Sequence, residues 1–579
     1  MAKIAEQSQR LVADFLDRQA SEDREYHVLD PAVMAHSFQE LMTRMMSDPA
    51  RLAESQLRLW QEYTKLWQAS LSRMMGEESA PVVTPAPGDR RFKDEQWQEN
   101  PVFDYIKQSY LLASRYMQSC VRETEGLDPH TAEKVDFYTR QFIDAMAPTN
   151  FAATNPEVLR RTVETGGENL VQGLSNLLDD LERGKGKLRI KMTDLERFKL
   201  GENVAVTPGK VVFQNELMQL LQYAPSTDTV LERPLLIIPP WINKYYILDL
   251  REKNSFIKWA VDQGHTVFVI SWVNPDARLA QKDFVDYLLE GPMAALEAIE
   301  QATGERDVNV IGYCLGGTLL ASQLAYMAVK GDDRIKSATF FTSMTDFSEP
   351  GELGVFIDEE QLALMEQQMD KTGYFEGASM AEAFNLLRAN DLIWSFVVNN
   401  YLLGKDPFPF DLLYWNSDST RMPAKMHRFY LRNMYQKNLL REPGGVTLDG
   451  VPIDLRKVKT PAFILSTKED HIAPWKSTYA LTRLVSGPAR FVLGMSGHIA
   501  GVVNPPAANK YGYWTNDDLP ESPDEWLRTA EAHEGSWWPE WQRWIESQGA
   551  ERLPARQPGD GKLAVIEDAP GAYVKARAD

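Results

Sequence analysis

The stretch that most constrains the fold of this chain is 308–321, where a short apolar segment runs into the motif G-Y-C-L-G-G and then into a helix-forming segment. A strand, a tight turn and a helix in this order are typical of a nucleophile elbow. Gly312 and Gly316 stand two residues on either side of Cys314, where only small residues fit. The N–H groups of the following helix point at the sulfur and favour a thiolate. We therefore predict that Cys314 is a nucleophile; the alternative is a buried structural thiol.

Charge and cysteine usage narrow the class of protein. The formal net charge of −20, without any basic stripe, argues against nucleic-acid binding. The two cysteines, Cys120 and Cys314, are far apart in the sequence, which excludes a disulfide framework and favours a reducing cytosol. The N-terminus lacks the apolar segment of a signal peptide, and the longest apolar run, 234–242, is too short for a bilayer. We expect a cytoplasmic protein with no transmembrane segment and no metal site.

Hydrophobic periodicity divides the chain into four predicted parts. We expect an N-terminal amphipathic helical segment at 1–79, a proline-rich linker at 80–99 and a helical domain at 100–200. Over 201–579, short apolar strands alternate with helices, which indicates a parallel sheet wrapped by helices and so an α/β fold. The interval at about 344–459 has little strand pattern and many aromatic residues. It is interpreted as a cap over the active site or as an ordinary helical subdomain.

One helical segment has an apolar face with two possible roles. After Pro49, apolar residues recur alternately every four and three positions, among them Leu57, Trp60, Trp67 and Met74. The favoured interpretation is a helix packed on the body of the protein or on a partner helix. The other is an exposed Met- and Trp-rich face for a hydrophobic surface or a partner.

A thiol nucleophile needs a base, and the base needs an acceptor that orients it. In folds with this elbow the chain order is nucleophile, acid, histidine. His498 lies on a glycine-flanked loop just after a predicted strand and is our candidate for the base. His427, in the predicted cap, and His533, in an acidic stretch, are interpreted as structural. Asp470 follows another predicted strand and is preferred over Glu469 as the acid.

An oxyanion hole requires two backbone N–H donors. The first is predicted at Leu315, directly after the nucleophile. The second should come from the loop after the apolar strand 235–238, where two prolines without N–H groups leave Trp241 or Ile242. We take Ile242 as the donor and Trp241 as a candidate pocket residue. His471, beside the predicted acid, is a further pocket candidate.

The choice of cysteine over serine indicates a class of reaction. When a thiolate attacks a thioester, the product is another thioester, so the acyl group stays activated for transfer to an alcohol. This arrangement suits acyl transfer from a CoA thioester better than hydrolysis. Water must be kept away from such an intermediate, which gives an aromatic cap a use.

Five separated blocks of the sequence are similar to those of one family, the polyhydroxyalkanoate synthases. They are G-Y-C-L-G-G at Gly312, E-D-H-I-A-P-W at Glu469, G-H-I-A-G-V-V-N-P-P at Gly497, P-P-W-I-N-K-Y-Y-I-L-D-L at Pro239 and N-N-Y-L-L-G-K-D-P-F-P-F-D-L-L-Y-W-N at Asn399. The similarity runs over 100–544. The length of the chain resembles class I, the single-polypeptide type that acts on short (R)-3-hydroxyacyl-CoA.

The resemblance implies an α/β-hydrolase fold with a cap inserted after the nucleophile helix and a helical domain before it. It implies polymerisation of (R)-3-hydroxyacyl-CoA with release of CoA, no cofactor, a homodimer, and association with polymer granules. The family's Cys-Asp-His positions fall on Cys314, Asp470 and His498. Trp415 matches an aromatic residue of the family's cap, whereas Trp241 departs from its pattern of a small residue or cysteine after the two prolines.

Two other functions are compatible with parts of the sequence. The first is a cap-bearing thiol esterase or hydrolase of the same fold, against which the acyl-retaining cysteine and the long N-terminal helical region both argue. The second is a catalytically silent granule-binding or scaffold protein. It would require the loss of a triad residue, and none is lost.

Overall fold

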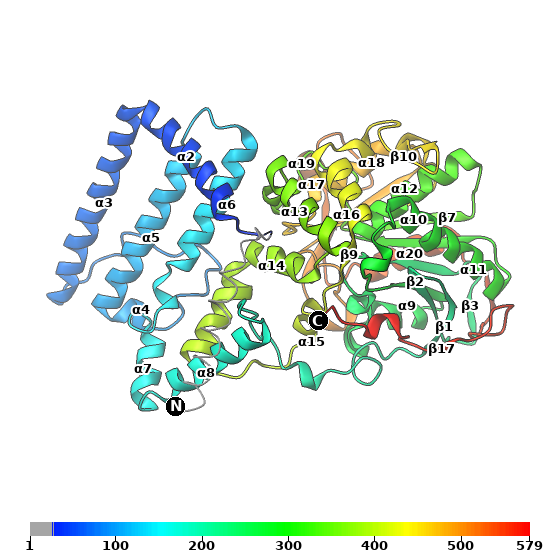
Figure 1. The fold of residues 1–579 in the computed structure, drawn as a ribbon, viewed down its shortest axis with the longest axis horizontal. Coiled ribbons are helices and arrows are strands. Elements are labelled where there is room, and N and C mark those ends of the chain that lie inside the picture. Colours follow the sequence, from blue (N-terminus) through cyan, green and yellow to red (C-terminus); the bar gives the residue numbers. More distant parts are fainter. Residues whose placement is uncertain (1–25, 27, 579) are drawn as a thin grey trace. The chain divides into compact units, whose positions relative to one another are not determined.

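The computed structural model describes residue 26 and residues 28–578 (Figure 1). The beginning of the predicted segment 1–79, including the stretch that argues against a signal peptide, lies outside the described residues. The chain divides into two compact units. The first comprises the described residues up to 194 together with 382–409, and the second comprises 195–381 and the described residues from 410 on.

The first unit is helical. Several of its helices begin with proline after an Asp or Asn whose side chain accepts backbone N–H groups of the first turn, which is a strong start signal because proline at this position lacks only an N–H that would have no partner. The helices are α2 (Pro31–Ser47), α3 (Pro49–Met74), α4 (Gln96–Glu99), α5 (Pro101–Arg122), α6 (Pro129–Ala145), α7 (Pro156–Glu164) and α8 (Glu168–Arg183), with the 3₁₀ turn η1 (Pro148–Asn150) and, later in the chain, the π turns η8 (Asn390–Trp394) and η9 (Val397–Leu402).

The proline-rich stretch 80–99 packs within the first unit. Its Val83, Phe92 and Trp97 are buried in a cluster with Leu66 of α3 and residues of α5. The Trp97 ring meets the Phe92 ring edge to face, with 5.1 Å between centroids. The segment therefore contributes core side chains as well as connecting two helical regions.

Residues 382–409, inside the interval predicted to be a cap, belong to the first unit. The backbone of η9 approaches α8 so closely that a Cβ on Gly173 would stand 1.8 Å from the Tyr401 carbonyl oxygen. The Tyr401 hydroxyl donates to Asp180 at 2.6 Å, and the Asn169 side chain donates to the Leu402 carbonyl at 2.8 Å. Contacts between residues more than 200 positions apart hold this part of the interval on the N-terminal helices.

The apolar face of α3 is exposed within the described chain, so it does not pack on the body of the protein. Packing on a partner helix, the other part of the favoured interpretation, stays a prediction, as does an exposed face for a hydrophobic surface. Trp60 is 67% and Trp67 60% accessible, whereas Leu66 is fully buried. The helix therefore uses a different face to contact α5.

The second unit is built on an 11-stranded sheet of the described residues, in the order β15-β14-β13-β12-β7-β6-β4-β5-β2-β1-β17. The central strands from β5 to β13 are parallel, and the strands at both edges are antiparallel. The α/β-hydrolase fold is confirmed in this mixed sheet with helices. The strands are β1 (Gly209–Gln214), β2 (Met218–Tyr223), β4 (Leu235–Ile238), β5 (Val267–Trp272), β6 (Val308–Tyr313), β7 (Ile335–Phe341), β12 (Ala462–Thr467), β13 (Ala489–Gly494), β14 (Gly512–Thr515), β15 (Glu531–Glu534) and β17 (Glu567–Asp568).

Helices and short elements complete the second unit. The helices outside the interval between β7 and β12 are α9 (Phe256–Asp262), α10 (Phe284–Leu288), α11 (Ala294–Thr303), α12 (Leu315–Lys330), α17 (Trp475–Tyr479), α18 (Leu481–Leu484), α19 (Pro523–Thr529) and α20 (Trp538–Ser547). Within that interval lie α13 (Glu359–Thr372), α15 (Asp411–Asn416), α16 (Ala424–Tyr430) and the π turn η10 (Leu431–Gln436), together with α14 (Gly377–Leu387), which belongs to the first unit from residue 382 on. Short strand pairs are β3 (Thr229–Leu231) with β16 (Arg552–Pro554), β8 (Tyr374–Phe375) with β9 (Met422–Pro423), and β10 (Thr447–Leu448) with β11 (Val451–Pro452).

The core on one side of the sheet is rich in tryptophan. Trp537, Trp538 and Trp541 are fully or almost fully buried and surround Phe256 of α9. Their indole N–H groups donate to Gly501 and Val502 carbonyls and to a β7 hydroxyl, so these large rings are buried without a lost hydrogen bond. Two of these bonds hold the loop that follows His498. Along the described chain, every helix is too short or too polar to cross a membrane.

Candidate active site

Cys314 sits in strained backbone between β6 and α12. Its φ of +51° and ψ of −118° are rare for a residue with a side chain, and such strain persists only where the surrounding structure enforces it. The Cys314 N–H donates to the Phe341 carbonyl at the end of β7, at 2.8 Å. The predicted strand, turn and helix are therefore present around this residue.

Three glycines allow the elbow to pack. A Cβ on Gly316 would stand 1.9 Å from the Ile238 carbonyl oxygen, and a Cβ on Gly317 would stand 1.9 Å from the Ser343 hydroxyl. At Gly312 the same atom would lie 2.5 Å from the Gly317 Cα. These glycines are required by close contact with neighbouring backbone and side-chain atoms.

Gly316→Ala is expected to destabilise the protein by about 1–3 kcal/mol, because its methyl group would overlap a backbone carbonyl at the end of β4 that cannot rotate away. Denaturant unfolding would measure this loss. Gly494→Ala is the matched control, since the nearest atoms to its Cβ are at 3.6 Å, an ordinary contact. Equal stability of both variants and the unmodified protein would contradict this account of the elbow.

Asp470 and His498 lie together at the ends of neighbouring parallel strands, β12 and β13. The His498 Nδ1–H donates to Asp470 Oδ2 at 2.6 Å. The other carboxylate oxygen, Oδ1, accepts the backbone N–H groups of Ile472 at 2.9 Å and Ala473 at 2.8 Å. The Asp470 side chain is fully buried. Its carboxylate is thus oriented by backbone donors, with one oxygen directed at the imidazole.

The imidazole of His498 connects this carboxylate to the thiol. Burial lowers the pKa of His498, but the charges of Asp470 and Cys314 and hydrogen bonds to both side chains raise it, so that the pKa lies well above the ordinary histidine value. The ring also stacks on Tyr313, the residue before the nucleophile, at 5.9 Å between centroids. The structure therefore brings Cys314, His498 and Asp470 together in the order that acid–base activation of a thiol requires.

The two downstream histidines that were set aside have other surroundings. His427 is fully buried in α16 and stacks on Phe375, and burial lowers its pKa to about 3, so it stays neutral near pH 7. His533 lies on the edge strand β15, where its Nε2 shares a hydrogen bond of 2.7 Å with the Thr515 hydroxyl.

The predicted oxyanion donors lie on elements that touch each other. Leu315 is the first residue of α12, so its N–H has no partner within the helix. The contact between Gly316 and the Ile238 carbonyl places the end of β4 against the start of α12. Ile242 follows in the loop after β4 and is buried.

Trp241 is buried in an aromatic cluster beside this loop. Its ring meets those of Phe284, Tyr287 and Tyr430 at 5.6–5.9 Å between centroids. Trp415 is also buried, and its indole N–H donates to the Lys244 carbonyl at 2.8 Å, so it holds the end of the same loop. His471 is partly buried, and its carbonyl accepts the Glu352 N–H at 3.0 Å.

Two tyrosines near the thiol were not among the predicted site residues. Burial raises the pKa of Tyr430 and of Tyr435, and the charge of Cys314 raises both further, which places both phenols near the sulfur. Their rings meet edge to face at 5.5 Å. They stand five residues apart, a spacing that points to different faces of an α-helix but to one side of a π turn, and η10 is a π turn. Only the aromatic richness of this interval signalled them.

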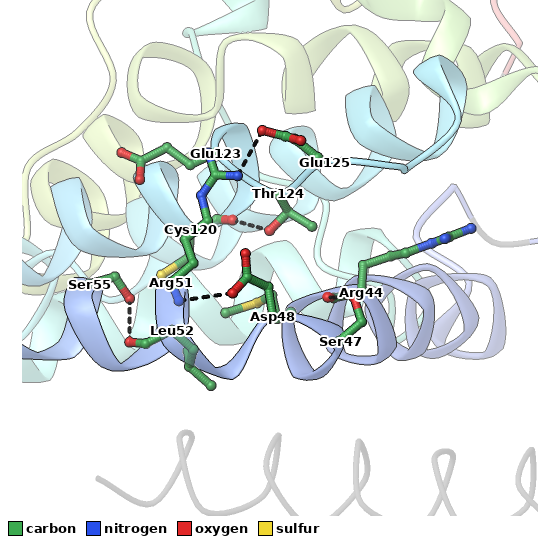
Figure 2. Close-up of a pocket in the computed structure, with 11 residues that line it drawn as sticks. Arg44, Ser47, Asp48, Arg51, Leu52, Ser55, Cys120, Glu123, Thr124 and Glu125 are labelled. Atoms are coloured by element: carbon green, nitrogen blue, oxygen red, sulfur yellow. Dashed lines mark hydrogen bonds and ion pairs between the residues drawn. The ribbon is translucent and has the colours of Figure 1, made fainter.

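Cys120, the second cysteine of the chain, lies in the first unit. Cys120 of α5 lines a pocket in the first unit together with residues of α2 and α3, as Figure 2 shows. An ion pair of 2.9 Å between Arg51 and Glu125 lies on the wall of this pocket. Burial raises the pKa of Cys120, which favours an unreactive thiol. Among the residues with a described structure, no group of three or more His, Cys, Asp or Glu is arranged to hold a metal ion.

In comparisons with known proteins, the chain matches polymerases of one family and the model of one fold. The family described as "Poly-beta-hydroxybutyrate polymerase (PhaC) N-terminus" matches residues 88–260, and "alpha/beta hydrolase fold" matches 234–505. The chain is 51% identical over its whole length to "Poly(3-hydroxyalkanoate) polymerase subunit PhaC" of Rhizobium meliloti, covering 94% of that protein. It is 53% identical to "Poly(3-hydroxyalkanoate) polymerase" of Methylorubrum extorquens, over 94% of this chain and 90% of the relative. It is 45% identical to "Poly(3-hydroxyalkanoate) polymerase subunit PhaC" of Cupriavidus necator, over 92% of this chain and 89% of the relative.

Proposed function

Because the chain belongs to the poly(3-hydroxyalkanoate) polymerase family, we propose that it polymerises short (R)-3-hydroxyacyl-CoA thioesters, such as 3-hydroxybutyryl-CoA, into polyhydroxyalkanoate with release of CoA. The observation that carries the proposal is the hydrogen-bonded set of Cys314, His498 and Asp470 at the elbow. A thiol in this position forms a thioester, which retains the energy needed to acylate an alcohol. The reaction needs no cofactor, because CoA leaves with the substrate's own sulfur.

In the first step of the proposed mechanism, the proton of Cys314 resides on His498 and the thiolate attacks the carbonyl carbon of the hydroxyacyl-CoA. The oxygen of the tetrahedral intermediate accepts hydrogen bonds from the N–H groups of Leu315 and Ile242. The carbon–sulfur bond to CoA then breaks, and the imidazolium gives its proton to the leaving thiolate. Asp470 keeps the imidazole oriented and stabilises its charge.

In the second step, a 3-hydroxyl group attacks the acyl carbon held on Cys314. His498 accepts the hydroxyl proton as the carbon–oxygen bond forms, and the bond to sulfur breaks to regenerate the thiolate. When the hydroxyl belongs to a hydroxyacyl-CoA, the product is a chain longer by one unit and still joined to CoA. That chain returns to Cys314 by the first step. Asp470 also assists the attacking hydroxyl in this proposal.

The aromatic side chains near the thiol support acyl transfer over hydrolysis. Trp241, Tyr430, Tyr435 and Phe347 form a connected set of ring contacts beside the Cys314 thiol. Such a lining excludes water, which would otherwise compete with the 3-hydroxyl for the acyl group.

Incubation with 3-hydroxybutyryl-CoA tests the function directly. A polymerase releases CoA and leaves insoluble polyester, whereas the alternative, a thiol esterase of the same fold, releases CoA and free hydroxy acid. CoA release across a series of acyl chain lengths tests the preference for short chains, with the highest kcat/KM expected for the short members. Stoichiometric free hydroxy acid without polymer would contradict the proposal.

The proposal extends to a homodimer that works at the surface of cytoplasmic polymer granules. The exposed face of α3, with Leu57, Trp60, Trp67 and Met74 each more than half accessible, supports an apolar contact of this kind. A polyester surface is largely apolar and lacks charge, so it matches this face.

Replacing both Trp60 and Trp67 by glutamate is expected to weaken binding of the purified protein to isolated granules by about tenfold or more, because two large apolar side chains lose their contact area. The co-sedimented fraction measures this. Val163→Glu is the control, since Val163 is 82% accessible on α7 of the same unit. Unchanged sedimentation of the double variant would rule out this face as the granule contact.

A further inference from the structure

The loop that carries the proposed second oxyanion donor ends in a buried lysine. Lys244 is 3% accessible. Its Nζ donates to the Ala576 carbonyl at 2.6 Å and reaches the Tyr573 carbonyl at 3.5 Å. Both acceptors belong to the last residues of the chain, at and just after the turn η14 (Tyr573–Lys575). A residue two positions from Ile242 is thus bonded directly to the C-terminal segment.

The same loop is bonded on its other side to the end of α15 and to the segment that follows it. The Trp415 indole N–H donates to the Lys244 carbonyl at 2.8 Å, and the Thr420 N–H donates to the Ile242 carbonyl at 3.3 Å. Asn243 and Ser419 form an isolated antiparallel bridge between these contacts. The loop therefore lies between the cap-side segment 415–420 and the C-terminal segment.

The C-terminal segment has further anchors in the second unit. Val574 is fully buried in the core. The Asn274 amide donates to the Ala576 carbonyl at 3.4 Å, and Arg421 donates to the Ala578 carbonyl at 3.1 Å. The backbone N–H of Arg421 donates to the Asn274 side-chain oxygen at 3.0 Å. In Figure 1 the red end of the chain accordingly lies beside α15.

Burying the ammonium group of Lys244 costs free energy. Burial lowers the pKa of Lys244, with the nearby Asp418 carboxylate opposing that effect. The Arg577 guanidinium lies 5.7 Å from the ring centre of Tyr414 on α15. Asp418 in turn accepts the Tyr246 hydroxyl at 2.9 Å. An apolar side chain would fill the site of Lys244 with less desolvation cost, whereas an ammonium group fixes the direction of two specific carbonyls.

We propose that the C-terminal residues 573–578 are a positioning element for the acyl-transfer reaction, acting through Lys244 on the loop that presents the Ile242 N–H. Lys244 is then a positioning residue, because it contacts the loop and the tail and not the reacting atoms. The inference rests on the proposed function, since it concerns an oxyanion donor for acyl transfer. When the bonds from Lys244 to the C-terminal segment are lost, the Ile242 N–H can move by a fraction of a hydrogen-bond length. This movement reduces the stabilisation of the transition state more than it reduces substrate binding.

A double-mutant cycle tests this inference in the whole chain of 579 residues. The changes are Lys244→Met, which keeps the length and apolar stem of the side chain, and deletion of residues 576–579, which removes the Ala576 and Ala578 acceptors but leaves Val574. We expect each change to lower kcat for CoA release by about tenfold or more with KM changed less than about threefold. Because the Lys244–Ala576 bond is the contact that both changes break, and the one through which the tail acts on the loop in this proposal, the double variant should be no slower than the slower single variant. Lys258→Met is the control, since Lys258 pairs with Asp262 within α9.

Several outcomes would overturn the inference. Multiplicative losses in the double variant would show that the tail and Lys244 act independently, and losses confined to KM would show a role in binding. If a variant fails to fold, trimming the intact enzyme with a carboxypeptidase replaces it: kcat should fall as Ala576 is removed while the near-ultraviolet circular dichroism stays unchanged, and constant kcat would contradict the role. Failure of the proposed function is distinguishable, because the unmodified enzyme would then form no polymer.

Discussion

Replacing Cys314 by serine is expected to lower both polymer formation and CoA release by about a thousandfold or more. A serine hydroxyl at this elbow is far less ionised than a thiol beside an imidazolium, so the first attack slows. Any acyl group that does reach the oxygen is held as an oxyester, which is a poorer donor to the next 3-hydroxyl. Both steps are therefore impaired, and the loss should appear in kcat.

Steady-state CoA release and the yield of insoluble polyester measure this effect. Cys120→Ser is the matched control, because Cys120 lies in the first unit and burial raises its pKa. It should retain the activity of the unmodified enzyme. Turnover by the Cys314→Ser variant at the rate of the unmodified enzyme would remove Cys314 from the mechanism.

Asp470→Asn is expected to give the second largest loss, about a hundredfold or more in kcat. The carboxylate raises the pKa of His498 against the effect of burial, which lowers it. With the carboxylate gone, burial dominates and the pKa of His498 falls, so the imidazole is neutral at a pH where the unmodified enzyme holds an imidazolium. The amide would also reverse the polarity of the bond to Nδ1 unless it turned its oxygen toward the ring.

The sign of this shift can be followed through alkylation of Cys314 by iodoacetamide. A raised His498 pKa means that an imidazolium persists to higher pH beside the Cys314 sulfur. The unmodified enzyme should therefore be alkylated near pH 6–7 about tenfold or more faster than the Asp470→Asn variant, in which the neighbouring imidazole is neutral. Equal alkylation rates of the two proteins at every pH would show that Asp470 does not affect the reactivity of Cys314. Cys120 provides an internal reference for reagent reactivity.

The chain order and local sequence were enough to predict the residues around the elbow. Glycines at 312 and 316 restrict the turn, and Asp470 and His498 each follow a strand, so parallel pairing of β12 and β13 brings their ends together. The α/β fold followed from the alternation of strands and helices. The antiparallel edge strands β14 and β15 were harder to predict from the sequence. They are short and partly polar, and they lack the buried apolar run of the central strands.

The parts that sequence reasoning missed depend on contacts between distant residues. Residues 382–409 have an aromatic, helical pattern that fits either a cap or the N-terminal unit, and only the contacts of Tyr401 with α8 decide between them. Tyr430 and Tyr435 come together through a π turn, for which the sequence holds no clear signal. The exposure of Trp60 and Trp67 was one of two interpretations left open, because periodicity identifies an apolar face but not what covers it.

The most direct test of Cys314 as the acyl carrier is peptide mass spectrometry after reaction with butyryl-CoA. This substrate lacks the 3-hydroxyl, so it can acylate the enzyme but cannot serve as the next acceptor, and the acyl-enzyme should accumulate. The account predicts one butyryl group on the peptide that contains Cys314, removable by neutral hydroxylamine as expected for a thioester, and none on the peptide of Cys120. Release of CoA with the butyryl group on another residue would contradict it.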